Sequence, residues 1–147
     1  MKLLLDTHAA LWWLADDEHL GDDAARQLTD ESNRVLLSCA VVWEVAIKRS
    51  LGKLQAPADL AATLLSGGAH PLPITIEHAA AVQALPWHHR DPFDRMLVAQ
   101  AFAEGAAIVS PDQRLSASAR PSGRVVIAPN GTPRSDDAQR IPACHTL

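Results

Sequence analysis

One short apolar run, repeated along the chain, constrains the fold more than any other feature of this sequence. The segments KLLLD (2–6), RVLLS (34–38), AAIVS (106–110) and RVVIA (124–128) share this form. Such runs are typical of strands buried on both faces. Segments with helical spacing occupy about 9–15, 22–32, 39–50, 58–66, 76–85, 92–104 and, weakly, 112–119. Strands alternating with helices predict an α/β fold, with a parallel sheet covered by helices.

The length of 147 residues fits one ordinary domain, and 48% hydrophobic with 20% charged residues is typical of a globular chain. We expect that domain to span 1–128. Residues 129–147 contain three prolines and no periodicity, which predicts a flexible tail. No apolar run approaches the ~20 residues of a membrane span, and MKLLLD is too short for a signal peptide. These features favour a cytoplasmic protein that contacts no membrane.

The net charge of −4 is unevenly distributed along the chain. Residues 1–112 contain 8 Lys and Arg against 15 Asp and Glu, a net charge of −7, whereas residues 113–147 contain 5 against 2, a net charge of +3. An acidic body argues against strong binding of phosphates by charge alone. A nucleic-acid substrate would therefore need bound cations, the basic C-terminal stretch or a basic partner.

Two acidic residues stand out by their neighbours. Asp6 ends the first predicted strand, and ligands bind beyond the carboxyl ends of the strands in an open parallel sheet. Glu44 is the single charged residue in CAVVWEVAI (39–47), so we expect packed side chains around it. An ionised carboxylate in that setting needs a positive partner. A bound cation would supply one, and so would Lys48 through an ordinary i,i+4 ion pair.

Two more carboxylates belong to the same pattern. Asp91 before Pro92 predicts a helix N-cap, which places Asp94 in the first turn of an apolar helix. Asp112 follows AIVSP, past the end of another predicted strand, although Asp is also an ordinary turn residue there. We expect Asp6, Glu44, Asp94 and Asp112 to converge on one crevice. Oxygen ligands without Cys or paired His favour Mg²⁺ or Mn²⁺, which suits phosphodiester hydrolysis by an activated water.

Several segments together resemble a known family. LLLDTHAALWWL (3–14), SCAVVWEVAIKRSLGKL (38–54), HHRDPFDRMLVAQA (88–101) and AIVSPDQRL (107–115) occur in the family's order. They resemble the PIN-domain ribonucleases, specifically the VapC toxins of type II toxin-antitoxin modules. The resemblance implies a three-layer α/β/α fold with a mainly parallel sheet of about four or five strands. It also implies Mg²⁺- or Mn²⁺-dependent cleavage of RNA, a VapB-like antitoxin partner and a homodimer.

The resemblance also implies roles for particular residues. The proposed metal-binding and catalytic residues are Asp6, Glu44, Asp94 and Asp112. The proposed hydroxyl residues beside them, each with a plain capping or strand-end role as the alternative, are Thr7, Ser38 and Ser110. The candidates for binding RNA phosphate are Lys48, Arg49, His89 and Arg95. Trp12 and Trp13 are candidates for stacking on bases or, more simply, for anchoring the core or a dimer interface.

Two other functions remain open on the sequence. A haloacid-dehalogenase-like phosphatase also has a nucleophilic aspartate after a strand, but such enzymes have Asp-x-Asp where this chain has Asp6-Thr7-His8. A catalytically silent PIN-like scaffold for a partner or for RNA is the second alternative. The presence of all four acidic residues weighs against it.

Overall fold

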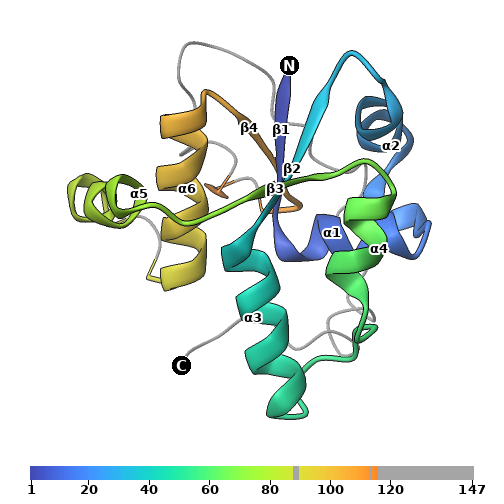
Figure 1. Ribbon diagram of the computed structural model, residues 1–147, viewed down its shortest axis with the longest axis horizontal. Coiled ribbons are helices and arrows are strands. Elements are labelled where there is room, and N and C mark those ends of the chain that lie inside the picture. The colour runs from blue at the N-terminus through green and yellow to red at the C-terminus, as the bar shows by residue number, and fades with distance from the viewer. Residues whose placement is uncertain (88–89, 113, 116–147) are drawn as a thin grey trace.

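The computed structural model describes residues 1–87, 90–112 and 114–115 as a sheet between two layers of helices (Figure 1). The four strands are β1 (Lys2–Leu5), β2 (Arg34–Ser38), β3 (His70–Leu72) and β4 (Ala107–Val109). They are all parallel, in the order β3-β2-β1-β4. This arrangement confirms the predicted α/β class with a parallel sheet.

The helices cover both faces of the sheet. In the view of Figure 1, α5 (Ile76–Ala81) and α6 (Pro92–Glu104) lie to the left of the strands, and α1 (Thr7–Leu14), α2 (Asp22–Thr29) and α4 (Leu60–Ser66) lie to the right. Helix α3 (Cys39–Ser50) continues from the end of β2. The short 3₁₀ turns η1 (Glu18–Leu20) and η2 (Val82–Ala84) follow α1 and α5. No helix in the described part of the chain is long and apolar enough to cross a membrane.

Burial of β1 explains its position in the middle of the sheet. Leu3, Leu4 and Leu5 have no solvent exposure, because β2 and β4 pair with β1 on its two sides and helices cover both faces. In register, Leu3 lies opposite Val35 of β2 and Ala107 of β4. The run of three leucines therefore forms the centre of the core, as an uninterrupted apolar strand should.

Strand β3 was not predicted from the sequence. It has three residues with Pro71 in the middle, and proline is tolerated in a sheet only where its missing N–H is not needed, as on an edge strand. The predicted helix at 76–85 is divided into α5 and η2, and the one at 22–32 ends at Thr29. The expected strand at 124–128, most of the weak helix near 112–119 and the tail at 129–147 lie outside the described residues.

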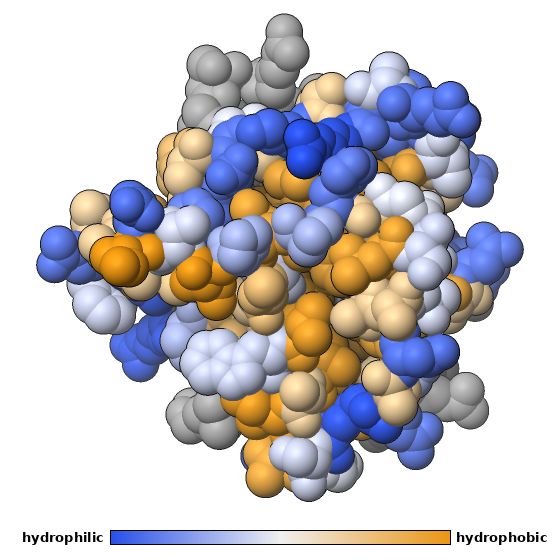
Figure 2. Space-filling model, viewed as in Figure 1, coloured by the Kyte–Doolittle hydropathy of each residue, from blue (hydrophilic) through white to orange (hydrophobic). Residues whose placement is uncertain are grey.

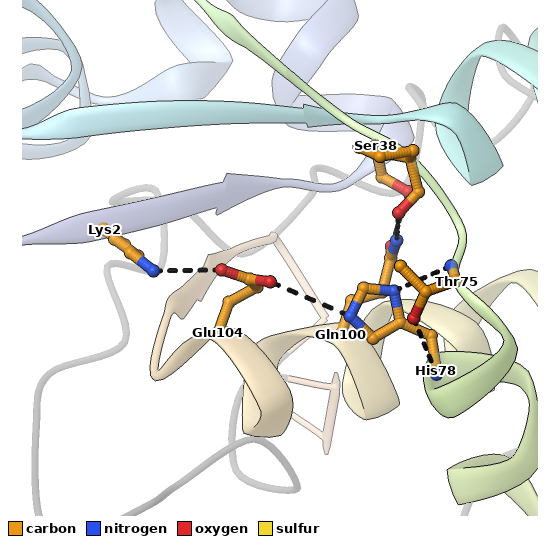
Figure 3. A network of polar contacts seen from close by, with 7 residues as sticks. Lys2, Ser38, Thr75, His78, Gln100 and Glu104 are labelled. Atoms are coloured by element: carbon orange, nitrogen blue, oxygen red, sulfur yellow. Dashed lines mark hydrogen bonds and ion pairs between the residues drawn. The ribbon is translucent and has the colours of Figure 1, made fainter.

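A polar network connects β1, α5 and α6 at the C-terminal end of α6, the end opposite its first turn (Figure 3). Glu104, the last residue of α6, accepts from the Lys2 ammonium of β1 at 2.9 Å and lies 3.8 Å from Nε2 of the buried His78 in α5. Thr75 and His78 form a capping box, in which each accepts from the other's backbone N–H at 3.2 Å. The network sets the position of α5 and α6 against the start of β1.

Apolar residues also reach the surface. Figure 2 shows hydrophobic residues in the middle of one face of the molecule, with hydrophilic residues around its margin. The large apolar residues with the highest exposure are Ile76 (84%), Trp87 (79%), Trp43 (58%) and Leu51 (54%). These side chains contribute little to the core that the sheet and helices form.

Gly105 ends α6 in the left-handed conformation, with φ 62° and ψ 36°. No atom lies within 4 Å of the place where a Cβ would be, so the cost of a side chain there is conformational and not steric. We expect Gly105→Ala to lower the free energy of unfolding by about 1 kcal/mol, and Gly105→Asn to lower it less, since Asn tolerates this conformation better. Urea denaturation measures both changes. A larger loss for Asn than for Ala would contradict this account.

Candidate active site

The predicted site residues come from four places in the sheet and its helices. Asp6 follows β1 and is the N-cap of α1, and Glu44 lies in the middle of α3. Asp94 is in the first turn of α6, and Asp112 follows the end of β4. Parallel strands end at the same edge of a sheet, and the helices that follow them begin there. The topology therefore brings these segments to one edge.

Asp6 is a buried carboxylate with 5% exposure. It accepts a hydrogen bond from the Ala9 N–H at 2.7 Å, which caps α1, and another from the side chain of Ser110. Burial raises the pKa of Asp6 above its ordinary value, and the charge of Glu44 adds to the increase, while His8 and the two hydrogen bonds oppose it. Ser110 thus lowers the pKa of Asp6.

Glu44 is 3% exposed, and its carboxylate contacts side chains of α1 and α3. Lys48 donates to Oε1 at 2.9 Å, and the Thr7 hydroxyl donates to Oε2 at 3.2 Å. The i,i+4 pair that the sequence allowed is therefore present. The charge of Glu44 still raises the pKa of Asp6 and of Asp94. The ion pair with Lys48 therefore does not remove Glu44 from the cluster of carboxylates.

Asp94 carries the clearest sign that the carboxylates converge. Burial and the charges of Asp91, Glu44, Asp6 and Asp112, in that order, raise the pKa of Asp94 to about 7. A carboxylate titrates this high only where negative charges crowd it and little water compensates. The charges of four acidic residues from different parts of the chain thus raise the pKa of Asp94 at one edge of the sheet.

Asp112 lies at the margin of this cluster. Its side chain is 36% exposed and forms an ion pair with Arg114 at 3.4 Å, while its backbone N–H donates to the Ser110 hydroxyl at 3.0 Å. Ser110 therefore connects Asp112 with Asp6. The charge of Asp112 raises the pKa of Asp94 less than the charges of Asp91, Glu44 and Asp6 do. This smaller effect agrees with the outer position of Asp112.

Ser38 does not act on the carboxylates through any hydrogen bond that the structure gives it. Its hydroxyl caps α3 by accepting from Ala40 N–H at 3.0 Å, and donates to Oε1 of Gln100 at 2.5 Å (Figure 3). Gln100 is fully buried and also donates to the Pro73 carbonyl at 3.3 Å. The capping role that the sequence left open for Ser38 is the observed one. Gln100, which the sequence analysis missed, joins β2 to α6.

The cationic candidates for phosphate binding lie in different surroundings. Arg95 is 5% exposed, and its guanidinium donates to the Val82, Leu85 and Pro86 carbonyls at 2.8–3.2 Å. These contacts favour a structural role, because they hold the chain between η2 and α6, and phosphate binding by Arg95 stays a prediction. Lys48 is paired with Glu44, Arg49 is exposed near the end of α3, and His89 lies outside the described residues.

The donor set fits a hard divalent cation. As placed, no three Asp, Glu, His or Cys side chains among the described residues are grouped closely enough to hold a metal ion by themselves. Mg²⁺ needs only one or two protein carboxylates, because waters and substrate phosphate complete its shell. The mutual repulsion that raises the pKa of Asp94 is relieved when a cation binds among the carboxylates. The chemistry of these residues is therefore compatible with Mg²⁺ or Mn²⁺.

Comparisons with known proteins agree with this fold. The family model of the PIN domain matches residues 3–121. The chain therefore belongs to the PIN domain family. It is 30% identical to Ribonuclease VapC22 of Mycobacterium tuberculosis (strain ATCC 25618 / H37Rv) over 122 residues, 81% of this chain and 93% of the relative.

A solved structure shares the fold. It is the crystal structure of VapBC2 from Rickettsia felis bound to a DNA fragment from their promoter, with a TM-score of 0.58 and 12% identity, covering 78% of this chain and 90% of the other. At that identity the likeness concerns the fold alone. The resemblance to PIN-domain VapC proteins seen in the sequence is thus confirmed.

The high pKa of Asp94 makes folding depend on pH when no divalent ion is present. In the folded state Asp94 keeps its proton up to about pH 7, whereas in the unfolded chain it releases the proton at its ordinary pKa of 3.8. Protonation of Asp94 therefore stabilises the folded state fully below about pH 4, and this stabilisation is lost as the pH rises through about 7. In EDTA, we expect the free energy of unfolding to be higher at about pH 5.5 than at about pH 8. The difference should be on the order of 1–2 kcal/mol after solvent screening.

The control for this prediction is Asp94→Asn, which removes the titrating group. Its free energy of unfolding should vary much less over the same pH interval, with a remainder due to Asp6, whose pKa is also raised. Urea denaturation at both pH values measures the effect. Stability that increases from pH 5.5 to 8 in EDTA would show that Asp94 is not crowded by negative charge.

Proposed function

We propose that this chain is a Mg²⁺- or Mn²⁺-dependent endoribonuclease that acts as the toxin of a toxin-antitoxin pair. The observation that carries the proposal is the hydrogen bond from the Thr7 hydroxyl to Glu44 at 3.2 Å, which places the residue after Asp6 against α3. The raised pKa of Asp94 agrees with a gathering of acidic residues at this edge of the sheet. Membership of the PIN domain family and the 30% identity to a ribonuclease support the same activity. A phosphatase of the haloacid-dehalogenase type has no such support.

In this proposal Asp6, Glu44 and Asp94 hold the metal ion, with Asp112 at the margin. When bound, the ion supplies an activated water and polarises the phosphoryl group of the RNA. Thr7 fixes one oxygen of Glu44, and Ser110 donates to Asp6, so both hydroxyls limit the rotation of the carboxylates they contact. Lys48 offsets part of the negative charge at Glu44.

The proposal includes a protein partner. The solved structural neighbour is a VapBC2 complex, and we propose that a VapB-like antitoxin covers the acidic site of this chain and inhibits it. We also propose a homodimer, as the resemblance implies. A silent scaffold remains the alternative, and measured activity decides between the two.

The activity is tested with purified protein and a mixed-sequence single-stranded RNA. We expect cleavage with Mg²⁺ or Mn²⁺ and none with excess EDTA. Asp6→Asn, Glu44→Gln and Asp94→Asn should each reduce the cleavage rate about 100-fold or more, since changes to residues that merely orient metal ligands already cost about 10- to 100-fold. Asp23→Asn, an exposed change in α2, is the matched control and should keep full activity.

Circular dichroism of each variant shows whether the fold is retained. Cleavage that persists in EDTA, or folded Asp6→Asn protein with full activity, would overturn the metal mechanism. Absence of cleavage by the unmodified chain under all metal conditions, together with tight binding of a partner, would favour the scaffold.

Expression of the chain in bacteria tests the toxin role. We expect growth to stop on induction, because cellular RNA is cut, and to continue when Asp6→Asn is expressed at the same level. Sequencing of RNA 5′ ends after induction identifies the cut sites. Coexpression of the product of a neighbouring small antitoxin-like reading frame should restore growth. Equal toxicity of the Asp6→Asn variant would exclude RNA cleavage as the cause.

A further inference from the structure

An exposed tryptophan lies beside the acidic site. Trp43 of α3 is 58% exposed and meets Phe93 of α6 edge to face, with ring centroids 5.2 Å apart and an angle of 76°. Each of these aromatic residues directly precedes a site carboxylate, Glu44 and Asp94 respectively. The Trp43–Phe93 contact therefore forms where α3 and α6 carry those carboxylates, and Phe93 supports one edge of the exposed indole.

A second tryptophan is held near the start of α6. Trp87 is 79% exposed, and the Arg95 guanidinium lies 4.2 Å from the centroid of its ring. Arg95 is itself fixed by hydrogen bonds to backbone carbonyls, two of them from Leu85 and Pro86 just before Trp87. The cation thus supports the ring from one side, while most of the ring remains in solvent.

The core does not account for these two positions. The chain has four tryptophans, two phenylalanines and no tyrosine. Trp12 and Trp13 are partly buried and pack against the core, and Trp12 contacts both His8 and His19 through its ring. Trp43 and Trp87 instead present large flat surfaces to water, and tryptophan is enriched at interfaces and provides a face on which bases can stack.

The charge of the molecule limits what can bind on these rings. Residues 1–112 have a net charge of −7, so phosphate contacts alone give a nucleic acid little affinity. Stacking of bases on aromatic rings needs no charge, and it is open only to unpaired bases, since a duplex hides their faces. A cation behind the Trp87 ring leaves its outer surface suited to stacking.

We propose that Trp43 and Trp87 are stacking platforms for unpaired bases of the RNA, next to the phosphate held at the acidic site. The inference rests on the proposed ribonuclease function and adds the side chains that would bind the bases of its substrate. Arg95 acts as a positioning residue that holds Trp87. The sequence left Trp12 and Trp13 as candidates either for stacking or for anchoring the core or a dimer interface, and the structure packs both against the core.

Binding is tested without cleavage, in the full-length Asp6→Asn protein with EDTA. The probe is a fluorescein-labelled unpaired RNA of mixed sequence, followed by anisotropy. Adding Trp43→Ala or Trp87→Ala should each weaken binding about 5- to 100-fold, whereas Trp→Phe at either position should keep most of the affinity. A duplex of the same sequence should bind more weakly, and its binding should not change with either tryptophan.

Phe102→Ala is the matched control, because Phe102 is an aromatic residue of α6 with 43% exposure near the end of the helix opposite Asp94. It should leave RNA binding unchanged. Light scattering measures the mass of each variant in parallel. Unchanged RNA affinity in both alanine variants would overturn the proposal. A fall in mass with unchanged affinity per protomer would assign the tryptophans to an interface between copies of the chain.

The two proposals fail separately. If the unmodified chain does not cleave RNA but tryptophan-dependent binding is found, the nuclease function is wrong and the stacking site stands. If metal-dependent cleavage is found but the alanine variants bind and cleave as the unmodified chain does, the stacking site alone is wrong. Should an alanine variant fail to fold, the phenylalanine variant and a Trp→Leu variant decide, since leucine keeps apolar bulk and removes the flat ring.

Discussion

Repulsion between carboxylates at one edge of the sheet is the constraint on which this structure depends. Like charges brought together in a partly dry place are unfavourable, so the rest of the fold must hold them there. The buried leucines of β1 place Asp6 at the edge, and the capped starts of α3 and α6 set the helices that carry Glu44 and Asp94. The favourable free energy of core packing thus offsets the unfavourable repulsion between the site carboxylates.

The polar contacts in the interior explain how α6 keeps its place. Gln100 joins it to β2 and to the chain after β3, and Glu104 joins it to β1 and α5. Arg95 holds the segment that leads into it. Buried polar groups are retained where each finds a partner, and no buried side-chain N or O atom in the described residues lacks one. Asp94 is therefore presented by a helix fixed along its length.

In the proposed function, the same edge would let an acidic protein act on an anionic polymer. A cation among the carboxylates would attract a phosphate locally, while the remainder of the surface repels it. Under the stacking proposal, aromatic rings near the site would add affinity that does not depend on charge. The two contributions would act on different parts of a nucleotide, the phosphate and the base, and would favour a strand whose bases are free.

The sequence by itself determined the class of fold and the bounds of α3 and α6, and it singled out the acidic residues proposed for the site, because periodicity, caps and strand ends are local properties of the chain. It did not reveal β3, whose three residues include Pro71, or the contacts of Arg95 with backbone carbonyls before α6. Tertiary structure decided those points. Burial and pairing depend on residues far apart, as with Ser38 and Gln100, which are 62 positions apart, and no local pattern encodes such contacts.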